Sequence, residues 1–250
     1  MAIWTMYASW QWVLMILAAI IIGMTKAGIK GIDMLSVTLM ALVFGSKSST
    51  GIVLPLLCVA DVAAVKYYHR HAQWHHFWRL LPWMALGILL GVWLGKDLPE
   101  TLFKRLMAAI VVVTIIIVLW MELRKNSKVP GHPSFASVTG LAAGFSTMIG
   151  NLAGAFSNLY FLAMRLPKND FIGTAAWLFL VINLFKLPLQ AFYWKNINST
   201  TLLTDLALLP ALAFGFWLGI RLVNQISNQH YRRVVIVLTL AGAVMLLVKQ

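Results

Sequence analysis

Long apolar runs separated by short polar or basic connections dominate the chain. Their lengths and spacing predict helices, and together they hold more apolar residues than one globular core could bury. The ten runs are Trp12–Met24, Met34–Phe44, Gly51–Val65, Leu80–Gly95, Leu106–Met121, Phe135–Leu152, Ala153–Met164, Phe171–Val181 (extending toward Ala191), Leu206–Ile220 and Val234–Val248. We predict an all-α polytopic membrane protein with about 8–10 hydrophobic helical segments.

Composition supports a bilayer as the surroundings of these segments. The chain is 61% hydrophobic and 11% charged, whereas a soluble domain carries about 25% charged residues. The net charge of +13 comes from basic residues that lie between the apolar runs and form no single face. Cytoplasmic loops therefore explain these residues better than nucleic-acid binding does. The single cysteine, Cys58, lies in an apolar run and is most simply a small buried hydrophobe.

The first two runs of each half are short and are interrupted by glycine and polar residues. A straight spanning helix needs about 20 residues. These pairs fit either two tight spans or a re-entrant pair of half-helices. Irregular backbone is tolerated at membrane depth only where it lines a cavity or is buried in protein.

The two halves of the chain resemble each other. At an offset of 122 residues Thr25 matches Thr147, Gly28 matches Gly150 and Asp61 matches Asn183. At an offset of 128 the matching sets are Pro82, Gly87, Gly91, Phe103, Lys104 and Arg105 with Pro210, Gly215, Gly219, Tyr231, Arg232 and Arg233. We predict transmembrane repeats over residues 1–125 and 134–250, joined by a polar linker over 126–133, in one integrated membrane domain.

Loop charge predicts the orientation. With the N-terminus outside, the inner loops carry 13 Lys and Arg residues and the outer loops carry 6. Basic residues favour the cytoplasmic side, so both termini are predicted outside. Each half then has an odd number of crossings, so the second half is inverted relative to the first. Inverted repeats with broken first helices are typical of secondary transporters.

The first cluster of polar residues lies between the first two runs, over Gly23–Asp33. It contains Thr25, Lys26, Gly28, Lys30 and Asp33. Glycines let the backbone turn close to a ligand, and free N–H groups with a lysine suit an oxyanion. We interpret Lys26, Thr25 and Gly28 as substrate-binding. Lys30 and Asp33 are candidates for a coupling or charge-pair role. The alternative is an ordinary cytoplasmic loop with snorkelling lysines.

The counterpart in the second half, Gly144–Asn158, has no charge. Thr147, Gly150 and Asn151 offer hydroxyl, backbone and amide donors, and Ser157 and Asn158 follow. We predict that Thr147, Gly150 and Asn151 bind substrate opposite the first cluster. Close helix packing by small residues is the alternative.

Three further polar residues lie inside later apolar runs, where such residues default to functional candidates. Asn183 and Lys186 are three residues apart, on one helical face. We predict that both bind substrate. Asp61 would pair with Lys26 or Lys186, as a structural ion pair or as a carrier of a coupling proton.

Four histidines lie in one basic and aromatic loop, but their spacing fits no compact set of metal ligands. They are His69, His71, His75 and His76, among Tyr68, Trp74 and Trp78. Interface anchoring explains them better, so no metal and no cofactor are predicted. No nucleophile–base pair or phosphate loop is visible, so no enzyme is predicted.

The chain resembles the sulfite exporter TauE/SafE family, also called TSUP, along nearly its whole length. The resemblance is carried by Gly23–Gly31, Pro55–Leu57, Ala60–Asp61, Tyr68–Trp74, the Pro82–Gly91 helix, Ile149–Gly154, Arg165–Lys168, Phe171–Ala175 and the Asn183–Lys186 pair. The family's glycine string is thinned here by Lys26, Lys30 and Asn151. The resemblance implies a multi-pass secondary transporter in the inner (plasma) membrane of a bacterium. It further implies a small sulfur-containing or organic anion such as sulfite, sulfoacetate or thiosulfate, more often exported.

We therefore predict a secondary transporter, most simply an exporter, that moves a small anion by alternating access, with proton coupling as an open question. A passive anion channel is the main alternative, and an intramembrane enzyme or assembly factor is a third. The expected partners are the anion, the lipid bilayer and a coupling proton, without nucleic acid. A homodimer stays open.

Overall fold

The computed structural model describes residues 6–123 and 132–248, and every regular element in these ranges is helical. The α-helices are α1 (Ser9–Lys26), α2 (Asp33–Phe44), α3 (Ser46–Ile52), α4 (Leu54–Tyr68), α5 (Trp74–Gly95), α6 (Glu100–Leu123), α7 (Pro133–Gly150), α8 (Ala153–Ala163), α9 (Lys168–Pro188), α10 (Ser199–Gln225) and α11 (Asn228–Val248). A short 3₁₀ helix η2 (His69–His71) follows α4, and a π-helix η3 (Leu189–Tyr193) extends α9. The ten apolar runs coincide with these helices, except that Gly51–Val65 crosses the break between α3 and α4 and that two runs end one or two residues beyond α7 and α8, so the predicted fold class is confirmed.

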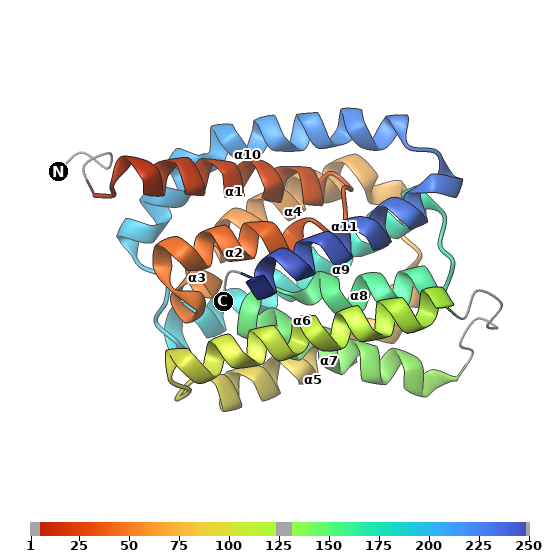
Figure 1. The fold of residues 1–250 in the computed structure, drawn as a ribbon, viewed down its shortest axis with the longest axis horizontal. Helices are drawn as coiled ribbons and strands as arrows, with labels where there is room; N and C mark the ends of the chain where they lie inside the picture. The colour runs from red at the N-terminus through yellow and green to blue at the C-terminus, as the bar shows by residue number, and fades with distance from the viewer. Residues whose placement is uncertain (1–5, 124–131, 249–250) are drawn as a thin grey trace.

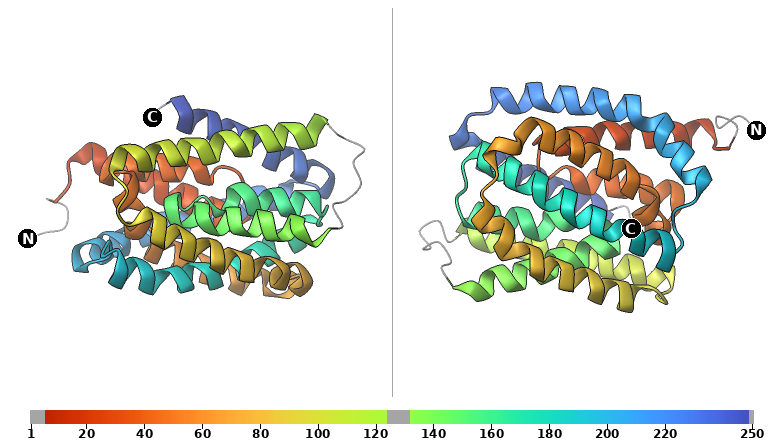
Figure 2. Two further views of the ribbon diagram at one scale, coloured as in Figure 1. Left: turned by 90° about the horizontal axis from the view of Figure 1, so that it is seen from below. Right: turned by 180° about the vertical axis from the view of Figure 1, so that it is seen from behind.

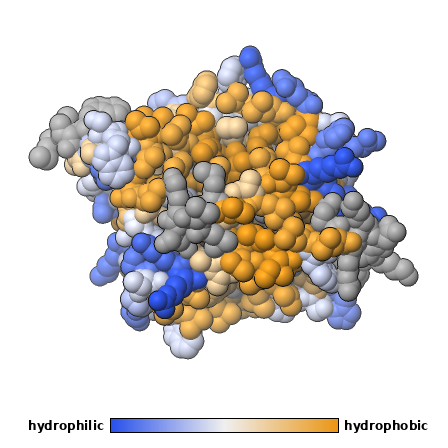
Figure 3. Space-filling model, viewed as in Figure 1, coloured by the Kyte–Doolittle hydropathy of each residue, from blue (hydrophilic) through white to orange (hydrophobic). Residues whose placement is uncertain are grey.

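The helices form one bundle with an apolar outer surface. Among the described residues, five are long and apolar enough to cross a membrane, namely α1, α5, α6, α9 with η3, and α10. The pair α3 and α4, bent by 46°, makes a sixth if it is counted as one span. Apolar residues cover the middle of the face drawn in Figure 3, and hydrophilic residues gather toward the ends of the bundle. This pattern is that of a multi-pass membrane protein.

Helices at equivalent positions of the two halves run in opposite directions. Figures 1 and 2 show this for α1 and α7, α4 and α9, α5 and α10, and α6 and α11. The contacts follow the same rule: α1 packs on α10 as α7 packs on α5, and α2 packs on α11 as α8 packs on α6. Helix α4 packs on its own counterpart, α9. A two-fold axis in the membrane plane between inverted halves would produce this pairing. Most of the predicted linker, 126–133, lies outside the described residues.

Glycines bring the long helix pairs close together. A methyl group at Gly215 would overlap the carbonyl group of Ile20, which brings α10 against α1. In the other half a methyl at Gly144 would overlap the carbonyl of Met84, which brings α7 against α5. Close backbone approach through small residues is the main packing device of helices in lipid. The two helix pairs α1–α10 and α5–α7 are therefore closely packed.

The short helices form two hairpins whose turns are buried. The α1–α2 hairpin is entered and left at the end of the bundle that holds the N-terminus, and the α7–α8 hairpin at the opposite end (Figure 1). Residues 27–31 of the first turn are all buried, and Gly150 and Leu152 of the second are also buried. An ordinary surface loop between two spans does not describe the first cluster. Both turns lie inside the protein, where irregular backbone needs internal partners.

Candidate anion site

The first turn owes its shape to two glycines and is held by two tyrosines. Gly28 has φ +121° and Gly31 has φ +101°, which L-residues rarely adopt. Tyr68 donates a hydrogen bond to the carbonyl oxygen of Ala27 at 2.8 Å, and Tyr231 donates one to that of Gly28 at 2.8 Å. These bonds supply partners for carbonyl groups that the end of α1 leaves without helical ones.

The lysine at the end of α1 is neutralised by a carboxylate on α4. Lys26 Nζ lies 2.6 Å from Asp61 Oδ1, and Asn183 Nδ2 donates to Asp61 Oδ2 at 2.6 Å. Asp61 is fully buried and Lys26 and Asn183 are nearly so. Of the two pairings open from the sequence, the structure brings Asp61 to Lys26. The two repeat-equivalent residues, Asp61 and Asn183, also contact each other directly.

The second turn contains no glycine with a positive φ angle and no carboxylate. Asn151 adopts the left-handed conformation, with φ 55°, which asparagine tolerates better than most residues. Lys186, from α9, donates to the Thr147 carbonyl at 2.8 Å, to Thr147 Oγ1 at 3.1 Å and to Asn151 Oδ1 at 2.6 Å. Asn151 Nδ2 donates to the carbonyl of Thr50 at 3.0 Å. A cation thus occupies the carboxyl-terminal end of α7, where the helix dipole favours it.

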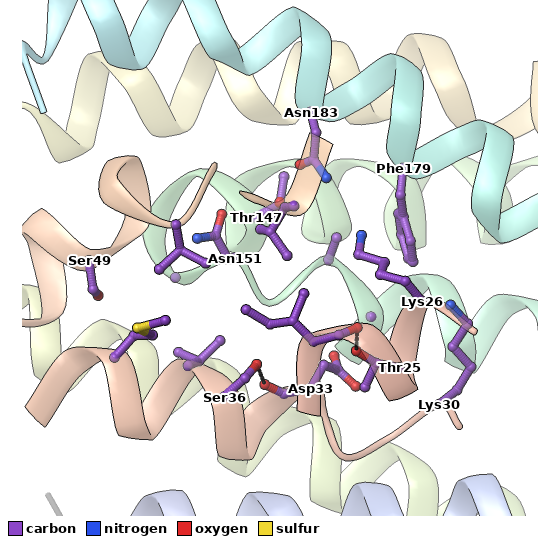
Figure 4. A pocket seen from close by; sticks show the side chains of 18 of the residues that line it. Thr25, Lys26, Lys30, Asp33, Ser36, Ser49, Thr147, Asn151, Phe179 and Asn183 are labelled. Atoms are coloured by element: carbon purple, nitrogen blue, oxygen red, sulfur yellow. Dashed lines mark hydrogen bonds between the residues drawn. The ribbon is translucent and has the colours of Figure 1, made fainter. Parts of the chain in front are cut away.

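A cavity lies between the two hairpins, bounded by α3, α4 and α9. Its volume open to the centre of a water molecule is about 60 Å³, several times the ~10–15 Å³ that one water needs. The polar residues that line it are Thr25, Lys26, Lys30, Asp33, Ser36, Ser49, Thr147, Asn151, Asn158 and Asn183. Figure 4 shows Thr147 and Asn151 across the cavity from Ser36 and Asp33, with Lys26 and Lys30 beside Phe179. The space suits a small polyatomic ion.

Lys30 is the lysine of the cavity lining that no ion pair neutralises within the described residues. It is buried, with 4% of its surface exposed, and within the described residues it forms no ion pair. Its Nζ lies 5.4 Å from the centroid of the Phe179 ring, over which Lys26 Nζ also lies at 4.8 Å. A buried ammonium without an anion is costly. The ring face offsets part of this cost, and an anion in the cavity would offset more.

Asp33 is the negative group in the cavity lining. Its Oδ1 accepts a hydrogen bond from the Gly31 N–H at 3.1 Å. A methyl group at Gly154, in the first turn of α8, would overlap its Oδ2. The carboxylate thus lies between the amino-terminal ends of α2 and α8, which favour negative charge. An anion in the cavity would share this region with Asp33.

The structure gathers most of the sequence-predicted site residues around this cavity. Thr25, Lys26, Thr147, Gly150, Asn151 and Asn183 line it, as do Lys30 and Asp33. Three predicted residues, Gly28, Asp61 and Lys186, are not in its lining. Gly28 shapes the turn, Asp61 binds Lys26, and Lys186 lies behind Thr147 and Asn151, where its ammonium group is fully hydrogen-bonded.

Several lining residues were not selected as site residues from the sequence, among them Phe179 and Asn158. Phe179 lies one helical turn before Asn183 on α9, and a phenylalanine in an apolar run gives no signal of a site. Asn158 lies in the second polar cluster, and its Oδ1 is buried without a hydrogen-bond partner among the described residues. An amide oxygen that borders a cavity and lacks a partner can accept a hydrogen bond from a water molecule or from a protonated group of a ligand. The four-residue spacing from Gly154 was the signal that could have found it.

The histidine-rich loop makes structural contacts. His76 Nδ1 lies 2.9 Å from the Tyr160 hydroxyl, and His71 Nδ1 lies 3.8 Å from Asp170 Oδ1. Gln73 also donates to Asp170, at 2.8 Å. Among the described residues no group of three His, Cys, Asp or Glu side chains is arranged to hold a metal. The loop therefore fastens α5 to α8 and α9.

The fold and the buried cavity define a multi-pass helical membrane protein of a transporter class. The family model described as "Sulfite exporter TauE/SafE" matches residues 14–246. The chain belongs to this family, as the resemblance in its motifs predicts. Comparisons with curated proteins and with solved structures give no significant match.

Proposed function

We propose that the protein is a secondary transporter that carries a small oxyanion, such as sulfite or a small sulfonate, through the cavity between its two hairpins. Sulfite export is the activity in the description of its family. The observation that carries the proposal is Lys30, a buried lysine that lines a polar cavity and has no ion pair within residues 6–123 and 132–248. An oxyanion would complete its charge and would accept hydrogen bonds from neutral donors nearby.

The neutral donors come from the second hairpin. The first turn of α8 borders the cavity at Ala153 and Gly154, and N–H groups at the start of a helix can bind an anion. Asn158 also borders the cavity, and the NH₂ group of its amide would be the donor, since its Oδ1 only accepts. Lys26 and Asn183 are engaged by Asp61, and they would set the shape of the site rather than its charge. Lys30 would then be the cation that attracts the ligand, and Asp33 in the same lining would oppose it.

The inverted arrangement supplies a mechanism for transport. The two hairpins enter from opposite ends and meet at the cavity (Figure 1). We propose that each half acts as a gate for one side of the membrane, so that rocking of the halves exposes the cavity alternately. Both termini face outside in this proposal. The basic residues Lys66, Arg70, Arg79, Arg165, Lys168, Arg221, Arg232 and Arg233 then lie toward the cytoplasm of a bacterial cell.

Thermal unfolding of purified protein with sulfite, sulfate, thiosulfate and small sulfonates tests the proposal, because a ligand of the folded state raises the melting temperature. Lys30→Gln removes a charge-assisted contact of about 1.5–3 kcal/mol, so we expect about 10- to 100-fold weaker binding. Lys66→Gln, at an exposed position of α4, is the matched control and should bind as the wild type does.

Asp33→Asn sharpens the test because it removes a negative charge from the cavity lining with little change in side-chain size. Asparagine keeps an oxygen for the Gly31 N–H and removes the charge that competes with an anion. We expect several-fold tighter anion binding. Unchanged affinity in Lys30→Gln, or weaker binding in Asp33→Asn, would contradict the proposed site.

A further inference from the structure

Asp205, on α10, is a buried carboxyl group that the anion site does not use. It is 5% exposed, and neither of its oxygens has a hydrogen-bond partner of normal geometry among the described residues. It lies in the second turn of α10, toward the end of the bundle that holds the N-terminus. An ionisable group inside a membrane span that lacks a partner is a candidate functional group.

Within the part of the chain that the structure describes, no basic side chain forms an ion pair with Asp205. Helix α10 packs on α1, α4 and α3. From α4, the backbone N–H of Leu56 lies nearest to the carboxyl group, and the Cys58 thiol is close enough to interact with it electrostatically. The phenol of Tyr7, just before α1, lies 3.3 Å from the Thr204 hydroxyl next to Asp205. The lysine of α3, Lys47, instead binds the carbonyl groups of Lys96 and Leu98.

The two protonation forms of Asp205 need different surroundings. A neutral carboxylic acid can stay in the apolar contact that the structure shows, whereas a carboxylate there would need donors. The nearest structural source is the amino-terminal end of α4, whose first-turn N–H groups have no helical partners. Residue 55 is proline, so the N–H groups of Leu54 and Leu56 are the ones on offer.

The same end of α4 borders the anion cavity. The 46° bend between α3 and α4 lies at Val53, and Ser49, Val53 and Leu57 line the cavity. Leu56 faces Asp205, and Leu57 faces the cavity. A movement of the bend that brings N–H groups to an ionised Asp205 would therefore displace part of the cavity wall.

We infer that Asp205 is the proton-binding site that couples anion transport to the transmembrane proton gradient, through the bend between α3 and α4. This inference rests on the proposed transport function and names the coupling ion. A proton on Asp205 stabilises the bend seen here. When Asp205 loses this proton, the start of α4 moves toward the carboxylate, and this movement changes access to the cavity.

Proteoliposomes loaded with sulfite separate this role from transport itself. Counterflow of radiolabelled sulfite needs no net proton movement, whereas uptake driven by an imposed pH gradient does. In the wild type the gradient should change the initial rate several-fold. Asp205→Asn, which mimics the protonated group, should keep counterflow within about two-fold while the response to the gradient disappears. Asp97→Asn, at an exposed position of the α5–α6 connection, should keep both.

Each outcome decides the inference. A full gradient response in Asp205→Asn overturns it. Asp205→Ser is a second neutral variant; if both variants are folded but lose counterflow, or if neither folds, the carboxyl group is structural and the inference is wrong. If the wild type itself shows no counterflow with sulfite or thiosulfate, the proposed transport of these anions fails first, and the coupling role fails with it.

Discussion

The two buried turns occupy equivalent places in the halves of the molecule but use different chemistry. The α1–α2 turn carries Lys26, Lys30 and Asp33 and obtains its shape from Gly28 and Gly31. The α7–α8 turn carries no charge, and a left-handed asparagine, Asn151, replaces the glycines. The lysine that binds this turn, Lys186, comes from α9, and its ammonium group donates its hydrogen bonds to the turn itself.

This difference assigns separate tasks to the two hairpins. An anion that enters the cavity can pair with Lys30 of the charged turn, because Lys30 has no ion pair in the described structure. The neutral turn is fixed by hydrogen bonds that a ligand does not need to break. An asymmetric site inside two similar halves therefore has one responsive side and one rigid side.

The largest expected effect tests the charged turn. Lys26→Met leaves Asp61 as a buried carboxylate with only the Asn183 amide as its partner. Removing one member of a buried ion pair costs about 3–5 kcal/mol. We expect the melting temperature in detergent to fall strongly.

The double variant Lys26→Met with Asp61→Asn is the decisive companion, since it removes both charges. It should recover most of the lost stability. If the double variant is no more stable than Lys26→Met alone, the ion pair is not what holds α1 to α4.

The neutral turn should tolerate loss of its cation better. Lys186→Met keeps most of the side-chain volume and removes a donor only from neutral acceptors, of which the Thr147 carbonyl keeps the Asn151 N–H and Asn151 Oδ1 is left without a partner. Hydrogen bonds from a charged donor contribute about 1.5–3 kcal/mol, so we expect a loss of about 2 kcal/mol in unfolding free energy. A larger loss than in Lys26→Met would reverse the proposed difference between the turns.

Helix positions could be predicted from the sequence because apolar runs in a bilayer leave few alternatives. The site was harder to predict, as Lys26, Lys30 and Lys186 show. All three lie in or beside apolar runs, but whether a buried lysine faces a ligand, a carboxylate or a helix end depends on contacts between distant segments. Asp61 lies 35 residues from Lys26 in the sequence and 2.6 Å from it in space.

Asp205 shows a second reason for incomplete prediction. The apolar run begins at Leu206, so the carboxylate appears to lie at the edge of a segment. Helix α10 begins at Ser199 instead, capped by Asn198. The residue is consequently buried between packed helices, in the second turn of α10, rather than in an exposed connection.

The glycines at equivalent positions of the turns provide a smaller test. Gly28 has φ +121°, whereas Gly150 is the last residue of α7 and has helical geometry. Gly28→Ala should cost about 1–2 kcal/mol from backbone strain. Gly150→Ala gains up to about 1 kcal/mol of helix propensity against a 3.0 Å approach to Met107 Cε, so it should be close to neutral. If thermal unfolding shows the same loss of stability in both variants, the two turns do not differ in the backbone conformation that they require.

The smallest expected effect concerns the tyrosines that hold the charged turn. Tyr231→Phe removes the hydrogen bond to the Gly28 carbonyl, and Tyr68→Phe removes the one to Ala27, with little change in packing. Each should cost about 1 kcal/mol. Tyr67→Phe, at an exposed neighbouring position, is the matched control and should cost almost nothing.

Because the hydroxyl groups of Tyr68 and Tyr231 bind only the first turn, the double variant that lacks both should loosen this turn selectively. Hydrogen exchange should then rise at residues 27–31 and stay unchanged at 150–152. Equal increases at both turns would mean that the two halves respond as one unit, and that the charged turn is not the responsive side of the site.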